Sequence, residues 1–382
     1  MIDIIGRGRF GARFVSLTRR PGFTAQALLI VFLVIGGWLA IDSVSANLER
    51  LSVKSGYGFL FEEAQFELGE SLIAFRAGDT YLRAFAAGIS NTLKVAVLGI
   101  ILSTMVGLVV ALGQLSPSVV VAGACRMFVD SVRNVPLLLQ LIFWQTFLTS
   151  GLPIVRNALS PVDGVYLTNR GLYLPAPVAD PAHGSIGIAL LVGAGLAALI
   201  WFAFRKGRLA CLALILPPLA VFLLAGAPLA FEAPELKGFN FRGGVEISPE
   251  FAAMLLGLTI YTGAFNAEVI RAGILGVDKG QREAGAALGL TPWRIMRKIV
   301  LPQALRIILP SMTNSYLNLT KESSLAVAIG YPEVVRVSNI ALFETGQAIE
   351  CISIIMIVYL SLSLFTSAIL NWLNARAQLV ER

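Results

Sequence analysis

The sequence predicts an all-α polytopic membrane protein with about eight transmembrane helices and both termini in the cytoplasm. Three observations predict this: the composition, the long apolar stretches, and the distribution of basic residues between them. Of the 382 residues, 56% are hydrophobic and only 14% are charged. In soluble globular domains about a quarter of the residues are charged. The composition therefore indicates a chain that lies mostly in lipid.

The number of predicted spans follows from the thickness of a bilayer. A spanning helix needs about 20 mostly apolar residues, because the hydrocarbon core is about 30 Å thick and offers no partner to an unpaired backbone group. Eight stretches meet or nearly meet this requirement: 25–41, 92–113, 135–150 with a helical lead-in from 119, 186–204, 209–230, 249–270, 304–320 and 351–373. The third and seventh are the weakest, because they are short or interrupted by Gln140, Gln145, Asn314 and Asn318.

The basic residues predict the orientation, because cytoplasmic loops carry an excess of Lys and Arg. The segment before the first stretch is rich in arginine, whereas the segment after it is acidic. Eight crossings place every later basic cluster on the same side as the amino terminus. These clusters are Arg205, Lys206 and Arg208, then Lys279, Arg282, Arg294, Arg297 and Lys298, and finally Arg376 and Arg382.

The first apolar stretch has a second interpretation as a signal peptide. The basic start, the apolar run and the sequence VSA ending at Ala46 resemble a cleavable leader. The run from Ala25 to Ile41 is longer than the usual signal core of about 7 to 15 residues, which favours a retained anchor helix. Cleavage between Ala46 and Asn47 would decide for the leader.

Several classes of function are not supported by the sequence. The net charge of +7 is spread over short loops beside apolar runs, which does not indicate a nucleic-acid surface. Cys125, Cys211 and Cys351 show no CxxC spacing and are interpreted as packing residues, and the single His183 as a solvated loop residue. The sequence has no metal-ligand spacing and no HExxH or G-x-S-x-G pattern, so we do not expect an enzyme. It also has no G-x-x-x-x-G-K-[ST] pattern, so we expect no ATP site on this chain.

The stretch 281–302 predicts two short helices joined by a turn on the cytoplasmic side. Residues 284–288 favour a helix with a small-residue face, and Gly289 suits the left-handed position just past its end. Thr291 can cap the next helix, Pro292 suits its first position, and Pro302 is expected to end it.

This stretch has two possible roles. It could be a basic helix that lies on anionic lipid through Arg294, Arg297 and Lys298. It could instead dock on a soluble partner, because a small-residue surface with one acid, Glu283, allows close backbone approach.

The spacing of this stretch resembles a known pattern. Glu283-Ala284-Gly285, then Gly289, then Ile299-x-Leu301-Pro302 is similar to the EAA loop in permease subunits of ABC importers. Gly285 departs from the second alanine of that pattern. The glycine could soften the helix by up to about 1 kcal/mol but keeps the surface small.

Other motifs narrow the resemblance to the polar amino acid permeases, over about 81–150 and 248–375. The motifs are Gly88 with Asn91-Thr92-Leu93, Arg133 to Leu138, Ala267 to Arg271, Lys279-Gly280-Gln281, and Leu319 to Leu325; Asn134 and Val135 depart from the Gly and Thr of the family. The anchor and the pair 186–204 and 209–230, introduced by Thr168 to Pro175, resemble the larger permease subunit of general L-amino-acid importers.

The resemblance implies an organisation of the chain. Five spans would form the permease core of a type I ABC importer. The expected parts are 1–80 with a basic tail, anchor helix and periplasmic linker, 81–150 with the first part of the core, 151–247 with a periplasmic loop and two added spans, and 248–382 with the second part of the core and the coupling loop 279–302.

The resemblance also implies the activity and the partners. The chain would be a permease subunit in a bacterial inner membrane that carries L-amino acids from the periplasm to the cytoplasm. It would bind no cofactor itself, because ATP and Mg belong to a partner ATPase dimer. The other partners would be a second homologous permease in a heterodimer and a periplasmic amino-acid-binding protein. The coupling residues would be Glu283, Ala284, Gly285, Gly289, Ile299, Leu301 and Pro302.

Polar residues within the spans are candidates for the substrate path, because charges in a bilayer are costly and face the bundle interior. They are Gln140, Asn266, Glu268, Thr313, Asn314, Asn318, Lys321 and Glu322. We prefer Asn314 with Asn318, on one helix face, as partners for a zwitterion. Simpler roles remain open: an ion pair of Glu268 with Arg271, interhelical bonding by Gln140, and snorkelling of Lys321 and Glu322.

One alternative function remains, an ion-coupled secondary carrier of amino acids. Such carriers are built from inverted repeats with broken helices. The sequence shows no self-similar halves, which favours the importer subunit.

Overall fold

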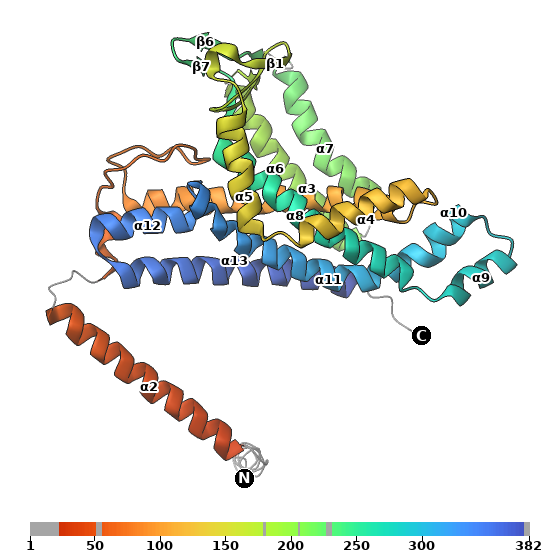
Figure 1. The fold of residues 1–382 in the computed structure, drawn as a ribbon, viewed down its shortest axis with the longest axis horizontal. Coiled ribbons are helices and arrows are strands. Elements are labelled where there is room, and N and C mark those ends of the chain that lie inside the picture. Colours follow the sequence, from red (N-terminus) through yellow and green to blue (C-terminus); the bar gives the residue numbers. More distant parts are fainter. Residues whose placement is uncertain (1–22, 51–55, 179–180, 205–206, 227–230, 378–382) are drawn as a thin grey trace, which may run out of the picture.

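The computed structural model describes residues 23–50, 56–178, 181–204, 207–226 and 231–377, so the predicted basic tail and the bases at 205–206 and 378–382 lie outside the described part. Within these ranges the chain is mainly helical (Figure 1). The helices are α2 (Phe23–Arg50), α3 (Tyr81–Gln114), α4 (Val119–Arg133), α5 (Leu137–Thr146), α6 (Pro181–Phe204), α7 (Gly207–Leu224), α8 (Pro249–Leu275), α9 (Lys279–Ala287), α10 (Pro292–Ile295), α11 (Leu301–Glu322), α12 (Val334–Thr345) and α13 (Ala348–Ala377).

Each predicted span overlaps a helix, with different boundaries. By length and apolar composition, α3, α8 and part of α13 can each cross a membrane. The helical segments 292–329 and 334–345, which meet at a bend of 49°, can also do so if the two together count as one span. The apolar parts of α2, α5, α6 and α7 are shorter. Helix α3 begins at Tyr81 rather than at 92, and α7 ends at Leu224 rather than at 230. Helix α12 was not predicted.

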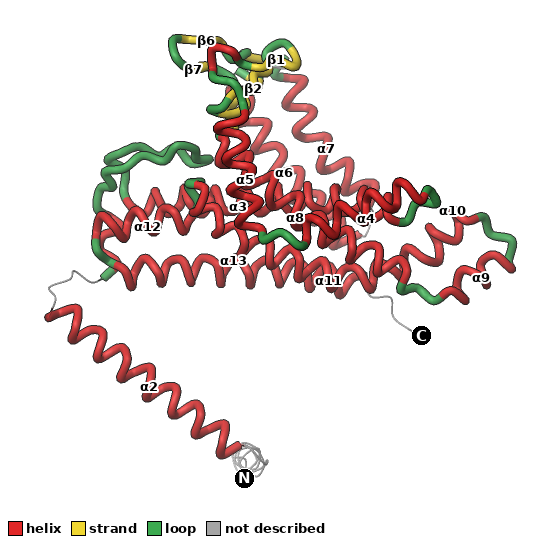
Figure 2. Tube along the Cα trace, in the orientation of Figure 1, coloured by secondary structure: helices red, strands yellow, loops and turns green. Residues whose placement is uncertain are grey.

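The prediction of a wholly helical chain is wrong in two stretches, 159–177 and 231–247, on either side of α6 and α7. Eight short strands lie there: β1 (Leu159–Val162), β2 (Val165–Thr168), β3 (Gly171–Leu174), β4 (Ala176–Pro177), β5 (Phe231–Glu232), β6 (Glu235–Lys237), β7 (Asn240–Arg242) and β8 (Val245–Ile247). They form an antiparallel sheet in the order β1-β2-β3-β8 and the pairs β4-β5 and β6-β7. Figure 2 shows these strands gathered at one end of the helices.

The sheet forms because apolar and aromatic residues gather in short runs between turn residues. Tyr166 pairs with Tyr173 across β2 and β3, and both tyrosine rings contact Phe241 of β7, at centroid distances of 4.3 and 5.1 Å. Aromatic and β-branched residues favour strands because they pack well against cross-strand neighbours. The strands also connect the pair α6 and α7 to the rest of the chain.

Helices α3 and α8 pack closely against each other over much of their length, and glycines make this possible. A Cβ on Gly107 of α3 would lie 2.6 Å from Asn266 Cβ and 3.1 Å from the Gly263 carbonyl oxygen of α8. Small residues allow such close approach in membranes, where van der Waals packing rather than water exclusion joins helices. On its other sides α8 packs against α5, through Leu141 and Gly257, and against α11, through Gly273.

Helices α6 and α7 pack against each other as a hairpin that extends from the strands (Figure 1). A Cβ on Gly193 would lie 2.9 Å from the Ala213 carbonyl oxygen, so the two backbones are in contact. Large apolar side chains on the hairpin are exposed, among them Leu191 and Leu224. His183, predicted in a loop, lies in the first turn of α6, and its side chain is outside the described part.

The segment 56–80 connects the α2 region to α3 and is fastened to the bundle along its length. Near its start the Gly56 N–H donates to Glu350 Oε1 of α13 at 2.6 Å. Near its middle Asn91 of α3 donates from Nδ2 to the Glu70 carbonyl oxygen at 2.8 Å. The same amide nitrogen donates to the Pro332 carbonyl oxygen at 2.9 Å. This segment is therefore bonded to α13 and to α3, and Asn91 bonds α3 to the loop before α12.

Candidate functional site

Helices α9 and α10 form a hairpin at the end of the molecule far from the sheet (Figure 1). Asp278 caps α9 by accepting from the Gly280 N–H at 2.8 Å. Gly289 has a φ of 71°, and the Leu290 N–H donates to the Gly285 carbonyl oxygen at 3.1 Å. This is the bonding of a left-handed helix end, which glycine adopts without strain. The predicted helix, turn and helix around Gly289 are confirmed.

The expected end of the second helix at Pro302 is wrong. Thr291 occupies the cap position without a side-chain bond, Pro292 starts α10, and α10 continues through a π-helical turn, Met296–Val300, into α11. Pro302 lies in the first turn of α11, directly after the wider turn. A proline is tolerated there because the regular bonding is already interrupted. Helix α10 therefore continues into α11 without a break in the helical backbone.

Gly285 lies on the inner side of the hairpin rather than on its outer surface. A Cβ at this position would lie 2.9 Å from Ile299 Cδ1 and 3.0 Å from Ile295 Cγ1. The residue is buried, and Ile299 is half-buried against it. The expectation that Gly285 keeps the outer surface small is therefore wrong: it sets how closely α9 lies against the following helix.

The outer surface of the hairpin is formed by its other small and apolar residues. Glu283 and Ala284 are exposed, together with Leu288 at 79% and Trp293 at 70% of their surface. Farther along, Leu301 is exposed and Pro302 half-buried. Large apolar side chains with this exposure at the tip of a helical hairpin are typical of a docking surface.

Two side chains fasten the hairpin to the bundle. Arg282 donates from its guanidinium to the Ile274 carbonyl oxygen near the end of α8, at 2.7 Å. Gln303 of α11 donates to Gln281 Oε1 of α9 at 3.4 Å. A displacement of the hairpin would therefore pull on α8 and α11 together.

Between α8 and α11 lies a half-open cavity of about 150 Å³, here called the interior cavity. It is lined by Tyr261, Thr262, Phe265, Ser315, Asn318 and Glu322. Two of the predicted path residues, Asn318 and Glu322, thus face the same space. The rings of Tyr261 and Phe265 lie 5.0 Å apart on the opposite wall.

A basic side chain that was not predicted for the substrate path lies beside this cavity. The Arg133 guanidinium, at the end of α4, lies 4.8 Å from the centre of the Phe265 ring. Glu322 lines the cavity itself, and Arg133 lies against the Phe265 ring of its wall. An acid and a base therefore flank one aromatic wall. The sequence places Arg133 in a family motif, but only the packing of α4 against α8 brings it to the cavity.

The other predicted path residues lie elsewhere. Glu268 and Arg271 form the expected ion pair three residues apart on α8. Gln140 donates to the carbonyl oxygens of Val132 and Val135, at 2.9 and 3.0 Å, and so ties α5 to the end of α4. Asn314 and Lys321 are exposed on α11 and do not line the interior cavity.

Two path candidates are buried in helix contacts. Asn266 is fully buried between α8 and α3, where its Nδ2 donates to Ser103 Oγ at 3.5 Å and its Oδ1 has no partner. Thr313 donates to the Leu309 carbonyl oxygen at 2.9 Å and accepts from Asn374 Nδ2 at 3.0 Å. In the described ranges no three His, Cys, Asp or Glu side chains gather as metal ligands would.

Comparison with known proteins gives relatives over nearly the whole chain. The chain is 44% identical over 368 residues to the general L-amino acid transport system permease protein AapQ of Rhizobium johnstonii. This alignment covers 94% of this chain and 92% of the relative. The chain is 33% identical over 407 residues to the glutamate/glutamine/aspartate/asparagine transport system permease protein BztB of Rhodobacter capsulatus. This alignment covers 96% of this chain and 95% of the relative.

A solved structure and a family also match. A chain from the crystal structure of an amino acid ABC transporter with histidines aligns with a TM-score of 0.48 and 23% identity, over 78% of this chain and 95% of that one. Residues 99–379 match the family described as "Binding-protein-dependent transport system inner membrane component". This match spans most of the sequence, including the hairpin and the interior cavity, and so the chain belongs to the family of inner membrane components of binding-protein-dependent transport systems.

Proposed function

We propose that this chain is a permease subunit of an ATP-driven importer that carries L-amino acids into the bacterial cytoplasm. Two relatives named as amino acid permeases, matched over more than nine tenths of this chain, support the substrate class. The partners are an ATPase dimer that holds ATP and Mg, a second homologous permease in a heterodimer, and a periplasmic amino-acid-binding protein. No G-x-x-x-x-G-K-[ST] pattern occurs in this chain, which supports a separate ATPase.

We propose eight crossings of the inner membrane with both termini in the cytoplasm. The bases of the hairpin, among them Arg294, Arg297 and Lys298, support a cytoplasmic hairpin. The sheet then lies in the periplasm, because one passage through α8 separates it from the hairpin. Five helices of the core surround the path, and α2, α6 and α7 are additions.

The α9–α10 hairpin is the surface on which the ATPase docks. Its exposed Glu283, Ala284 and Leu288 form the contact, while Gly285 and Ile299 hold the two helices together. Because α10 continues into α11, and Arg282 is bonded to the end of α8, a movement of the hairpin shifts both walls of the interior cavity. The unbroken continuation of α10 into α11 is the observation that carries this proposal.

The interior cavity holds the substrate during transport. An α-amino acid carries a carboxylate and an ammonium group, and Arg133 and Glu322 supply the opposite charges beside one cavity. The faces of Tyr261 and Phe265 attract the ammonium group as well. Asn318 offers both a donor and an acceptor.

Reconstitution tests both the function and the site. Proteoliposomes that contain both permeases, the ATPase and the binding protein should take up an L-amino acid with ATP and without an ion gradient. Arg133→Gln should weaken the apparent affinity about 10- to 100-fold, because hydrogen bonds to charged groups contribute about 1.5 to 3 kcal/mol. Arg126→Gln, two turns earlier on α4 and also exposed, is the matched control. Uptake driven by an ion gradient without the ATPase would instead establish a secondary carrier.

A further inference from the structure

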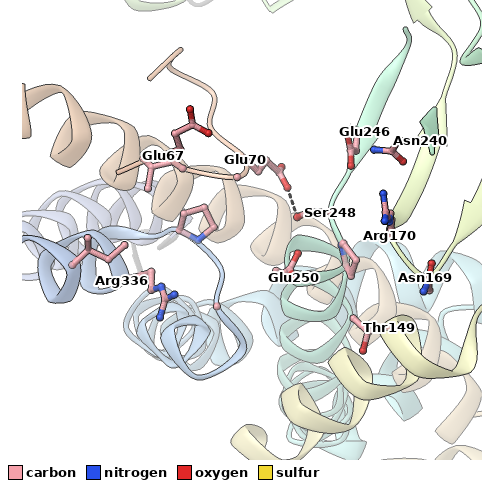
Figure 3. Close-up of a pocket in the computed structure, with 16 residues that line it drawn as sticks. Glu67, Glu70, Thr149, Asn169, Arg170, Asn240, Glu246, Ser248, Glu250 and Arg336 are labelled. Atoms are coloured by element: carbon pink, nitrogen blue, oxygen red, sulfur yellow. Dashed lines mark hydrogen bonds between the residues drawn. The ribbon is translucent and has the colours of Figure 1, made fainter. Parts of the chain in front are cut away.

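A second and larger cavity, of about 540 Å³, lies at the sheet end of the bundle (Figure 3). We call it the outer cavity. Its walls come from five distant parts of the chain: the segment 56–80, Thr149 in the turn after α5, the strands and turns between 165 and 247, the start of α8, and the residues from 330 to 340 around the start of α12. The volume falls within the range of about 300 to 1,000 Å³ that is usual for small-molecule sites.

The outer cavity contains charges of both signs that do not neutralise one another. Glu70 is paired with Lys94 and accepts from Ser248. The remaining acids are Glu67, Glu246 and Glu250, and the bases are Arg170 and Arg336. Among the described residues, no ion pair within 4.0 Å joins either arginine to an acid. Figure 3 shows the two arginines on opposite sides of the cavity, with Glu250 between them.

Several of these charged groups are held in place by hydrogen bonds. Gln145 of α5 donates to Glu250 Oε1 at 3.2 Å, and the Tyr173 hydroxyl lies 3.1 Å from Glu246 Oε1. Arg170 donates to the Phe239 carbonyl oxygen at 3.3 Å. Burial raises the pKa of Tyr173 to about 12, and the phenol therefore stays protonated beside Glu246 near neutral pH.

From these charges we propose that the outer cavity is a second binding site for a free amino acid, separate from the interior cavity. The α-carboxylate binds to Arg170 or Arg336, and the ammonium group binds to the neighbouring glutamates. Three acids and two bases leave a formal charge of −1, which repels a simple carboxylic acid. A simple amine leaves both arginines without a partner. A molecule with both groups satisfies both kinds of side chain.

The site would explain the segment inserted between α5 and α8, because Arg170, in the turn between β2 and β3, and Glu246 of β8 both belong to it. The placement of this cavity on the periplasmic side and the choice of an amino acid rest on the proposed function. An amino acid released from a binding protein would be held there before it enters the bundle.

Direct binding tests the proposal. The complex of both permeases and the ATPase, in nanodiscs and without binding protein, is titrated with L-glutamine and followed by saturation-transfer NMR. All variants carry Glu322→Gln, so that binding of L-glutamine in the interior cavity is weakened in every sample. Arg170→Gln with Arg336→Gln should weaken the remaining binding at least about tenfold. Arg242→Gln, an exposed arginine of β7 that does not line the cavity, should leave it unchanged.

Analogues of the probe test the need for both charges. The deaminated and the decarboxylated forms of L-glutamine should each bind at least about tenfold more weakly than L-glutamine itself. Equal binding of the decarboxylated form would overturn the proposal, because a carboxylate contact would then contribute nothing.

The remaining outcomes separate this inference from the proposed function. If Glu322→Gln alone abolishes all binding of L-glutamine, or if the double arginine variant binds like the Arg242→Gln control, the outer site does not exist. ATP-driven uptake by the wild-type complex would still support the importer. Binding that behaves as expected in a complex without ATP-driven uptake would leave the outer site standing and remove the importer.

Discussion

Replacing Gly285 with leucine should open the α9–α10 hairpin without changing its outer surface. A Cβ at this position would already lie 2.9 Å from Ile299 Cδ1 and 3.0 Å from Ile295 Cγ1. Carbon atoms in contact prefer about 3.5 to 4.0 Å, so the helices must separate before the rest of the side chain is placed. Overpacking of this kind costs about 1 to 3 kcal/mol. A cost of about 2 kcal/mol lowers the ratio of native to opened hairpin about 30-fold.

The assay is co-purification of the permease with its ATPase in mild detergent, followed by ATP-driven uptake in proteoliposomes. Gly285→Leu should insert in the membrane normally but retain little ATPase. Gly280→Leu is the matched control, because Gly280 lies on the same helix and its nearest neighbour, Asp278 Oδ1, is at an ordinary contact distance of 3.4 Å. Adding Ile295→Ala to Gly285→Leu should restore space and recover association. Association that is unchanged in Gly285→Leu, or that is not recovered in the double variant, would refute the inward position of this residue.

Three further predictions concern the bundle, the sheet and the path. Gly107→Val should destabilise the α3–α8 pair by about 1 to 3 kcal/mol and lower the melting temperature in detergent, whereas Gly123→Val, which has open space around its Cβ, should not. The stability that neutral Tyr173 provides should be complete below about pH 10 and be lost as the pH rises through about 12, because burial raises its pKa to about 12; melting curves from pH 9 to 12 should be flatter for Tyr173→Phe. Asn318→Leu should raise the KM of uptake more than Asn314→Leu, because only Asn318 lines the interior cavity; an equal effect would contradict that site.

Local patterns were sufficient where one segment decides its own structure. Small residues followed by Gly289 and Pro292 predicted the hairpin, because a left-handed glycine and a proline at a helix start have local causes. The spacing of Glu268 and Arg271 predicted their ion pair for the same reason. The family prediction is confirmed by the match over residues 99–379.

Predictions failed where the result depends on what a residue meets elsewhere. The short strands after α5 were missed because each becomes stable only when paired, as β3 is with β8 across more than 70 residues. Pro302 was taken as a helix end because the π-helical turn before it cannot be read from the residue itself. The inward direction of Gly285 depends on the return of Ile295 and Ile299 along the next helix.

By itself the sequence determined that this is a largely apolar, many-helix chain with a glycine-hinged hairpin between two apolar stretches, because hydrophobic length and backbone preference are properties of short segments. Only the tertiary structure decided which polar groups share a space. Arg133 lies beside the interior cavity, and both Arg170 and Arg336 line the outer cavity, because helices and strands far apart in the chain pack side by side. Such juxtapositions depend on the packing of whole elements, which no local spacing encodes.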